Sequence, residues 1–380
     1  MPITARIALM LPRYSRYGGV EQFGYRLSAW LAERGAAVDF LCARQEVEAP
    51  SGVRVLSVGR PRLSKRAKMD FFARKVEEMR LAGDYDCAIS LGKTLNQDIL
   101  RVGGAPLREF WRYSETALPA GPLRWLKSLR RKLSPAGRLS QEIEDQQYHS
   151  GCKIVANSHF VRDRILNAYP QLKAEEIEII YNRPDLTRYH PPKREESLAA
   201  RADLGIAPGQ LAVGLATSNY LLKGTGPLIQ ALAQLPENYH LFIAGGRGHS
   251  QYDSLAKRLR VAGRVHFLGK VDDMPRFYRA LDIFTLPSFY DACSNAVLEA
   301  LASGLPTLSS ASNGSSFFLP PENVVSNPGD SAALAETLLR LTPQALENRE
   351  RDERPGFNWP TDIKAGMEGF TAVVEEFLAR

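Results

Sequence analysis

The strongest constraint in this sequence is an alternation of short apolar runs with longer helical stretches. In the first half, apolar runs at residues 6–11 and 37–42 flank a helical stretch at 20–34 that stops at Gly35. This order predicts a parallel sheet covered by helices. The same alternation begins again at residue 211. We therefore predict an α/β protein with two Rossmann-like domains.

A segment rich in proline and polar residues, 179–192, separates the two halves. Because 380 residues exceed one typical core, the domain boundary belongs here. We predict an N-terminal domain over residues 1–184, a C-terminal domain over 185–360 and a final helix over 361–380. That helix has apolar residues at spacings of three and four, so it must pack against another surface. Further strands are predicted at 53–58, 87–90, 153–157, 211–216, 241–244, 264–268 and 283–286.

The composition is that of a folded globular enzyme. Hydrophobic residues make up 44% of the chain and charged residues 24%, which disfavours extensive disorder. No run of about 18 apolar residues is present, and the first residues lack the apolar core of a signal peptide. These features predict a cytoplasmic protein without a transmembrane helix.

Neither a metal site nor a disulfide framework is indicated. The four cysteines are far apart, without a Cys-x-x-Cys pair. Cys293 lies in a candidate site loop, but no base lies near it in sequence, so packing is favoured over nucleophilic catalysis. Asp84 and Asp86 form an Asp-x-Asp, a metal-binding pattern, at the start of the strand predicted at 87–90. Ligands bind at the opposite end of parallel strands, so a turn is favoured, with metal binding as the lesser alternative.

Residues 288–307 carry the densest set of signals. A short apolar strand ends before them, and a helical pattern follows over 294–303, so that the turn carries Asp291 and the helix carries Glu299. The backbone amides of residues 292–295 lie at the expected helix N-terminus, which suits phosphate oxygens. Together these groups can hold a sugar hydroxyl, a diphosphate and a ribose. The alternative is an ordinary N-terminal charge and a solvated glutamate, and spacing alone favours this plainer interpretation.

Two further loops carry groups that suit a ligand. Gly18 and Gly19 lie at the entrance of the first helix, where missing side chains let a ligand approach the backbone. With Gly24, their spacing does not match the dinucleotide fingerprint, which disfavours a nicotinamide dehydrogenase. In the second half, Lys223 beside Gly224 is a point charge suited to phosphate. A simple turn and an ordinary surface lysine are the alternatives.

The net charge of +7 is concentrated between residues 108 and 138, which hold eight Lys or Arg and two Glu. Leucines recur at helical spacing over 123–133 with cations on their flanks, as in basic helices at anionic membrane surfaces. Nucleic acid would fit the charge alone, but an apolar stripe is not an evenly charged face. A lid helix that packs on its own domain is the other alternative. The predicted membrane contacts are Trp111, Arg124, Trp125, Lys127, Arg130 and Arg131.

Five blocks, in order, resemble the retaining GT-B glycosyltransferases called family four, which use nucleotide-sugar donors. The resemblance spans nearly the whole chain. It implies two Rossmann-like domains facing each other across a cleft, with a C-terminal helix that crosses back to the first domain. The blocks are Gly18-Gly19-Val20-Glu21, Ala156-Asn157-Ser158-His159-Phe160-Val161, Ile180-Tyr181-Asn182-Arg183-Pro184-Asp185, Lys223-Gly224 and residues 288–307.

The resemblance also implies roles for single residues. Asp291 would bind hydroxyls of the donor sugar, and Lys223 would neutralise the departing diphosphate. Asp291 stands where the family more often has Glu, and Ser218 where an arginine is common. The other implied donor-binding residues are Gly18 and Gly19 at the phosphates, Ala292, Cys293, Ser294 and Asn295 through their amides, Glu299 at the ribose, Gly269 and Val271 at the base, and Arg247 in place of the missing arginine.

Within that family, residues 101–106, the basic helix and residues 142–146 resemble bacterial α-glucosyltransferases that extend the inner core of lipopolysaccharide. This implies retaining, metal-independent transfer of a hexose from a UDP-linked or similar nucleotide sugar to a hydroxyl of a cell-envelope glycan or glycolipid. No cofactor is implied. The expected location is peripheral, at the anionic inner face of the plasma membrane, without nucleic acid. A GT-B-type phosphorylase or epimerase and a non-catalytic glycan- or membrane-binding module are the alternatives.

Overall fold

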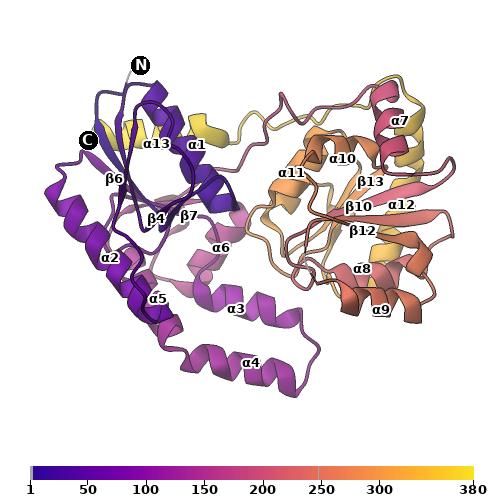
Figure 1. The fold of residues 1–380 in the computed structure, drawn as a ribbon, viewed down its shortest axis with the longest axis horizontal. Helices are drawn as coiled ribbons and strands as arrows, with labels where there is room; N and C mark the ends of the chain where they lie inside the picture. Colours follow the sequence, from indigo (N-terminus) through magenta and orange to yellow (C-terminus); the bar gives the residue numbers. More distant parts are fainter. Residues whose placement is uncertain (1–2, 247) are drawn as a thin grey trace. The chain divides into compact units, whose positions relative to one another are not determined.

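The chain folds into two compact α/β units (Figure 1). The computed structural model describes residues 3–246 and 248–380. The final segment of the chain returns to the first unit, as the resemblance implies. The first unit comprises Met1–Trp111, Gly121–Asn182 and Asp362–Arg380, and the second Arg112–Ala120 and Arg183–Thr361.

The first unit is built on a seven-stranded parallel sheet with the order β5-β3-β1-β6-β7-β8-β9. β1 lies between β3 and β6, and its Leu9 pairs with Phe40 on one side and Ile89 on the other. The chain moves outward from β1 in both directions, which is the doubly wound arrangement. The strands are β1 Arg6–Met10, β3 Ala37–Cys42, β5 Val53–Ser57, β6 Cys87–Ser90, β7 Ile99–Val102, β8 Lys153–Ala156 and β9 Ile177–Ile179, with a separate small pair, β2 Arg13–Tyr14 and β4 Arg44–Gln45.

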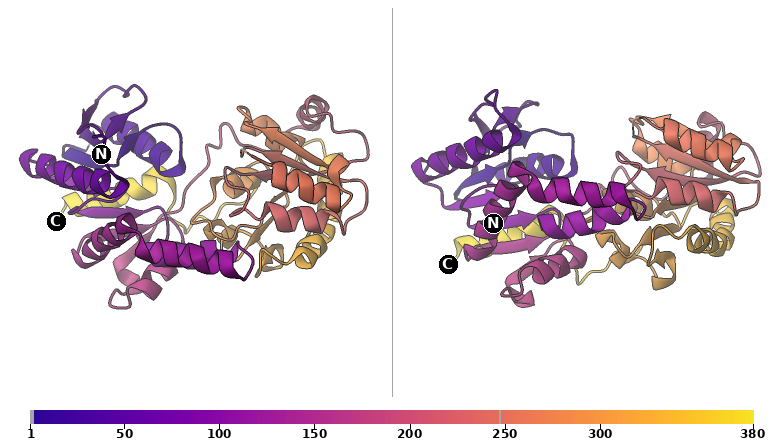
Figure 2. Two further views of the ribbon diagram at one scale, coloured as in Figure 1. Left: turned by 60° about the horizontal axis from the view of Figure 1, so that its bottom comes forward. Right: turned by 90° about the horizontal axis from the view of Figure 1, so that it is seen from below.

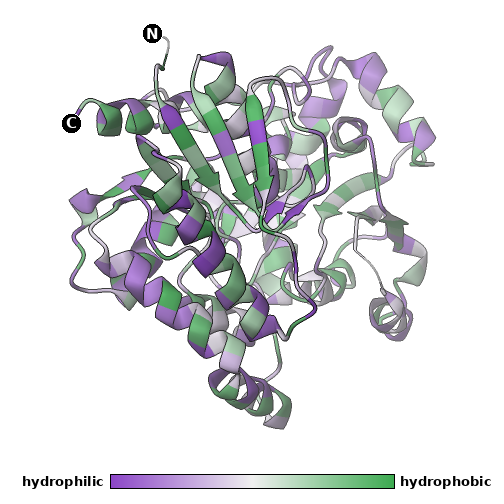
Figure 3. Cartoon of the chain, turned by 60° about the vertical axis from the view of Figure 1, so that its left-hand side comes forward, coloured by the Kyte–Doolittle hydropathy of each residue, from purple (hydrophilic) through white to green (hydrophobic). Residues whose placement is uncertain are grey.

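Helices cover both faces of this sheet, and Figure 3 shows the strands as a mostly hydrophobic band between them. The last helix, α13, packs beside α1, where Phe370 is fully buried and Trp30 Nε1 donates to Thr371 Oγ1 at 3.0 Å. α2 and α5 pack together on the opposite face (Figure 1). The helices are α1 Gly19–Glu33, α2 Lys65–Ala82, α3 Leu107–Thr116, α4 Pro122–Leu133, α5 Pro135–His149, α6 His159–Ala168 and α13 Gly366–Leu378, with a 3-10 turn η1 at Ala174–Glu176.

The second unit contains a six-stranded parallel sheet with the order β12-β11-β10-β13-β14-β15. Right-handed crossovers place α8 and α9 on one face and α10 and α11 on the other, as Figures 1 and 2 show. α12 packs beside α8, and α7 packs beside α10. The elements are α7 Arg194–Asp203, β10 Leu211–Ala216, α8 Thr225–Leu232, β11 Tyr239–Ala244, α9 Ser250–Arg258, η2 Ala262–Arg264, β12 Val265–Gly269, α10 Met274–Ala280, β13 Ile283–Leu286, α11 Asn295–Ala302, β14 Thr307–Ser310, η3 Gly314–Phe318, η4 Pro321–Asn323, β15 Val324–Val325 and α12 Ser331–Glu350.

Two buried strands, β7 and β14, lie outside the predicted set, and each contains buried polar side chains. β7 contains Arg101, which is 5% exposed, donates to Asn182 Oδ1 at 2.9 Å and lies over the ring of Phe23. β14 contains Ser309 and Ser310, which are fully buried and donate to backbone carbonyls. In both strands hydrogen bonds satisfy the buried polar groups. An apolar pattern is absent from β14, whereas Arg101 is the single polar residue of β7. The short strands β9 and β15 also lie outside the predicted set.

Candidate functional site

The loop between β13 and α11 forms the centre of the candidate site in the second unit. Its helix begins at Asn295, where Ser294 Oγ accepts a hydrogen bond from the amide of Val297 at 3.4 Å. The segment 292–294 therefore leads into the helix, and Ala292 and Cys293 are buried there. Cys293 Sγ contacts Ser315 Oγ at 3.6 Å, which fits the packing role expected of this thiol.

Lys223 and Asp291 meet at the carboxyl edge of the second sheet. Lys223 Nζ donates to the Asp291 carboxylate and lies 3.4 Å from the carbonyl oxygen of Tyr290. The two side chains are 19% and 18% exposed, so both remain accessible from solvent. Their strands, β10 and β13, are neighbours in the sheet, which brings together loops that are 68 residues apart in sequence.

Close backbone packing fixes this pair of loops. Gly224 adopts a φ of 70°, and a Cβ there would lie 2.2 Å from the carbonyl oxygen of Pro287. The amide of Phe289 donates to the carbonyl of Leu222 at 2.8 Å. Glycine is therefore required beside Lys223 by both the left-handed backbone and the lack of space.

Residues with hydroxyl and amide side chains, which sequence reasoning did not identify, form hydrogen bonds that fix the backbone of the loop around Asp291. The Asp291 amide donates to the carbonyl of Ser312, and its own carbonyl accepts from the amide of Gly314, each at 2.9 Å. The carbonyl of Ser288 accepts from Ser310 Oγ at 2.5 Å and from Ser312 Oγ at 2.6 Å. The available signal is the serine-rich run at 309–316, which includes Asn313 and begins at the end of β14, the next strand after α11.

Glu299 lies on α11 with its carboxyl group against tyrosine hydroxyls. Tyr278, which is fully buried, donates to Glu299 Oε2 at 3.0 Å. Burial raises the pKa of Glu299 to about 7, while hydrogen bonds from Tyr278 and Tyr189 and the positive charge of Arg188 oppose that rise. The plainer interpretation of Glu299 as a solvated residue is therefore wrong. Its carboxyl group is partly buried and accepts hydrogen bonds.

The predicted base-binding residues Gly269 and Val271 lie at and just after the end of β12, beside Gly245, which follows β11. Gly245 and Gly269 both have left-handed backbones, with φ of 86° and 65°, and the amide of Gly245 donates to the carbonyl of Gly269 at 2.5 Å. Val271 follows β12 and is half-buried. Arg247 lies outside the described residues.

Gly18 and Gly19 lie in the first unit at the start of α1. Gly18 has a φ of 105° and precedes the helix, whereas Gly19 is its first residue and has no atom within 4 Å of the position of a Cβ. The backbone at Gly19 is therefore open to approach. Glu21, in the same turn, pairs with Arg13 at 2.7 Å.

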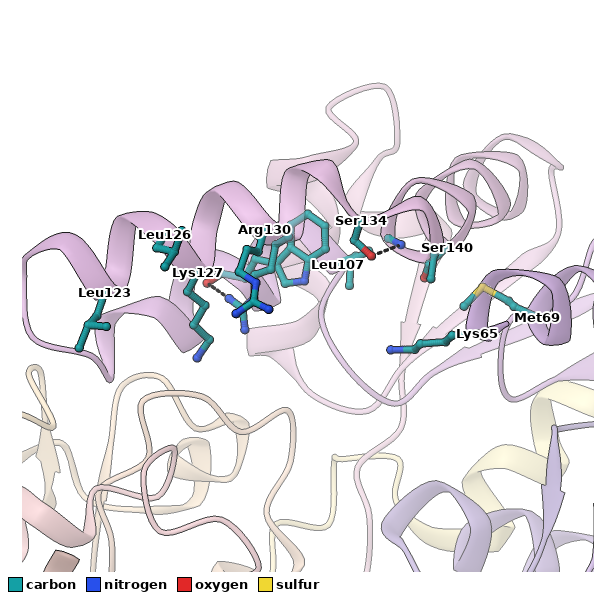
Figure 4. A pocket seen from close by; sticks show the side chains of 13 residues that line it. Lys65, Met69, Leu107, Leu123, Leu126, Lys127, Arg130, Ser134 and Ser140 are labelled. Atoms are coloured by element: carbon teal, nitrogen blue, oxygen red, sulfur yellow. Dashed lines mark hydrogen bonds between the residues drawn. The ribbon is translucent and has the colours of Figure 1, made fainter. Parts of the chain in front are cut away.

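The predicted basic helix is α4, and no residue along it is buried. Leu123 is 76%, Trp125 66% and Leu133 58% exposed, which does not fit a lid whose leucines all pack on their own domain. A cavity of about 550 Å³ lies between α4 and its neighbours α2, α3 and α5. Figure 4 shows Lys127 and Arg130 extending from α4 into this space, with Lys65 of α2 directed into it from the other side. Trp111 and Arg131, two further predicted membrane contacts, also line this cavity. Arg131 Nη1 donates to the Trp111 carbonyl at 3.2 Å.

Across residues 3–246 and 248–380, no helix is both long and apolar enough to cross a membrane. Over the same residues, no group of three or more His, Cys, Asp or Glu side chains gathers as metal ligands would. Asp86 instead accepts from the amide of Arg6 at 2.7 Å, and Asp84 has a left-handed φ of 48°. Asp84 and Asp86 thus lie in the segment that leads into β6.

Residues 208–343 match the family model for glycosyl transferases group 1. These residues form a group 1 glycosyltransferase domain. The domain contains Lys223, Asp291 and Glu299. Over the whole chain the fold is GT-B: a WaaG crystal structure, of a glycosyltransferase involved in lipopolysaccharide biosynthesis, covers 90% of this chain and 94% of its own at 21% identity with a TM-score of 0.73. Anabaena HepE in complex with UDP and glucose covers 99% of both chains at 17% identity and a TM-score of 0.68.

The similarity to sequence relatives extends beyond the residues of the group 1 domain. A D-inositol 3-phosphate glycosyltransferase of Nocardia farcinica is 28% identical over 264 residues, 63% of this chain and 57% of the relative. The lipopolysaccharide glucosyltransferase WaaG of Escherichia coli K12 is 31% identical over 135 residues, 34% of this chain and 36% of the relative. The matched regions thus span about half or less of these relatives. The chain is related to lipopolysaccharide core glucosyltransferases and to inositol phosphate glycosyltransferases.

Proposed function

We propose that this chain is a retaining glycosyltransferase that moves a hexose from a UDP-linked sugar to a hydroxyl of a cell-envelope glycan or lipid-linked acceptor. The observation that carries the proposal is the meeting of Lys223 and Asp291 at the carboxyl edge of the second sheet, inside the group 1 domain. Relatives that act on lipopolysaccharide and a structural neighbour bound to UDP and glucose support the choice of acceptor and donor.

Lys223 and Asp291 neutralise each other in this structure. In the proposed complex the donor diphosphate becomes the partner of Lys223, and the Asp291 carboxylate accepts hydrogen bonds from hydroxyls of the donor sugar. The amides at the start of α11 hold the phosphates. Glu299 accepts from the ribose, and residues near Gly269 and Val271 contact the base.

Leaving-group stabilisation dominates the proposed reaction. The bond between the anomeric carbon and the diphosphate oxygen breaks as the acceptor oxygen bonds to the same face of that carbon. Lys223 and the oriented amides stabilise negative charge that develops on the diphosphate. The proton of the acceptor hydroxyl passes to the departing phosphate, so the step requires neither a metal nor a cofactor.

Turnover of radiolabelled UDP-glucose with a rough lipopolysaccharide acceptor tests the assignment. We expect Lys223→Gln to lower kcat by about 100-fold or more, since removing one stabilising donor in such sites costs about 3 kcal/mol. Asp291→Asn should also lower turnover, because the sugar hydroxyls lose their charged acceptor. Lys257→Gln, a basic residue in the last turn of α9, is the matched control. If either variant kept full activity, the substituted residue would not have its proposed role.

We further propose that α4 contacts the anionic inner face of the plasma membrane. Its exposed Leu123 and Trp125 lie on the same short helix as Arg124, Lys127, Arg130 and Arg131, a combination that favours binding at the lipid headgroups. We expect Arg130→Glu with Arg131→Glu to reduce flotation with vesicles that contain phosphatidylglycerol. Lys257→Glu with Arg258→Glu on α9 is the control, and equal flotation of all three proteins would contradict the assignment.

A further inference from the structure

A small hollow inside the second unit is lined mainly by arginines. It lies where α7, α10, α12 and the start of β13 come together (Figure 1). Its volume of about 20 Å³ leaves room for one ligand of the size of a water molecule. Among the described residues that line it, Asp282 is the single carboxylate, and the arginines are Arg194, Arg201, Arg279, Arg349, Arg351 and Arg354.

Three of these arginines have acidic partners near the surface of the unit. Each pairs with a glutamate whose side chain is exposed, so these charges are balanced in contact with solvent. The pairs are Arg279 with Glu196 at 3.5 Å, Arg194 with Glu350 at 3.1 Å, and Arg351 with Glu347.

The other three arginines share one carboxylate. Arg201 Nη1 lies 2.9 Å and Arg349 Nη2 2.6 Å from Asp282 Oδ2. Within residues 3–246 and 248–380, no other carboxylate comes within 4.0 Å of either side chain, and none comes that close to Arg354. Three guanidinium groups therefore surround a single negative charge, which leaves an excess of positive charge inside the unit.

Arg354 contributes most to this excess because it is 9% exposed. Its guanidinium group donates to the backbone carbonyls of Tyr278, Arg279, Leu281 and Ser303, at 2.9–3.3 Å. Burial lowers the pKa of Arg354 to about 10, so the group keeps its charge at neutral pH. A buried charge without a counter-charge is costly, and carbonyl dipoles offset only part of that cost.

Asn348 on α12 also lines the hollow and has an unsatisfied donor. Its side chain is 7% exposed, and within residues 3–246 and 248–380 its Nδ2 has no hydrogen-bond partner. A buried polar group ordinarily has one. The neighbouring guanidinium groups cannot supply it, because they are donors themselves. The missing partner must therefore be an acceptor.

We propose that this hollow binds a small monovalent anion, of the size of chloride, between Arg201, Arg349, Arg354 and Asn348. The anion supplies the acceptor that Asn348 Nδ2 lacks and reduces the excess of positive charge. Larger anions such as sulfate and phosphate exceed the space. Because Arg354 donates to the Ser303 carbonyl at the end of α11, the anion also stabilises the helix that begins at the candidate donor loop.

Thermal unfolding of the full chain tests the site without nucleotide or acceptor. Chloride replaces gluconate stepwise at constant total salt, so that ionic strength does not change and the bulky gluconate serves as the excluded anion. Above the Kd, each tenfold increase in chloride should raise the Tm of the second unit by about 3–5 °C, by mass action. Asn348→Leu, which removes the unsatisfied donor at similar size, should abolish this dependence. Asn238→Leu, at an exposed asparagine of the same unit, should retain it.

Crystals of the wild-type chain grown in sodium bromide provide a second measurement should Asn348→Leu fail to fold. We expect an anomalous bromide peak inside the hollow, within contact of Arg354 and Asn348. A hollow that holds only water in those crystals would overturn the proposal. So would a Tm that is the same in chloride and gluconate, or a chloride dependence that persists in Asn348→Leu.

Discussion

At the scale of single residues, Glu299 has an environment that its position in sequence does not reveal. A glutamate on a short helix is ordinarily solvated, but here Tyr278 and Tyr189 bind its carboxyl group and burial raises its pKa to about 7. In the unfolded chain the same group titrates near 4.5. Between these two values the folded protein holds a proton that the unfolded chain releases.

This difference predicts a pH dependence of stability. Because the folded-state pKa is raised, the contribution of Glu299 to the free energy of unfolding falls as pH rises from about 4.5 through 7. We expect Glu299→Gln to remove up to about 3 kcal/mol of that fall, at about 1.4 kcal/mol per pKa unit. Urea unfolding at pH 5 and pH 8 measures it, with Glu336→Gln on α12 as the control. The same pH dependence in wild type and Glu299→Gln would contradict the pKa.

The site residues differ in how far the sequence reveals them. Lys223 lies beside a loop glycine after one apolar strand, and Asp291 lies before a helix start after another. The alternation of strands and helices therefore predicts that both lie at the same edge of the sheet. The tyrosines at 189 and 278 and the serines at 310 and 312 reach the site from elements distant in sequence. Only the folded chain brings these supporting groups together.

At the scale of elements, the last helix depends on the first unit for its stability. α13 contributes Met367, Phe370, Val373 and Val374 to the same core as β1, β3 and β6. We expect Phe370→Ala to cost about 3–5 kcal/mol in the free energy of unfolding, as is usual for a buried phenylalanine. Chemical denaturation measures this cost. Phe317→Ala, at a phenylalanine that is 48% exposed, serves as the comparison, and similar losses in both variants would contradict the packing of α13.

The strand predictions succeeded where burial and apolar sequence coincide. β3, β6, β10 and β13 have the predicted bounds because their side chains are almost all apolar. β7 and β14 are equally buried, but their arginine and serine groups are satisfied by partners that no local pattern encodes. Helix α4 was predictable for another reason: its leucine spacing is regular although its side chains remain exposed.

At the scale of the whole molecule, each unit has its own sheet and core, so a ligand of one unit stabilises that unit first. Amide exchange detects this locally, because exchange follows local opening. We expect UDP to slow exchange at residues 217–224 and 287–297 of the second unit, while β3 and β5 of the first unit keep their rates. The mass-action gain reaches about 2.7 kcal/mol at a UDP concentration one hundred times Kd. Lys223→Gln should weaken this protection at equal UDP concentration, since the phosphates lose their cation. Protection that remains unchanged in Lys223→Gln, or that appears only in the first unit, would place the nucleotide elsewhere and remove the basis for a donor site at the end of β13.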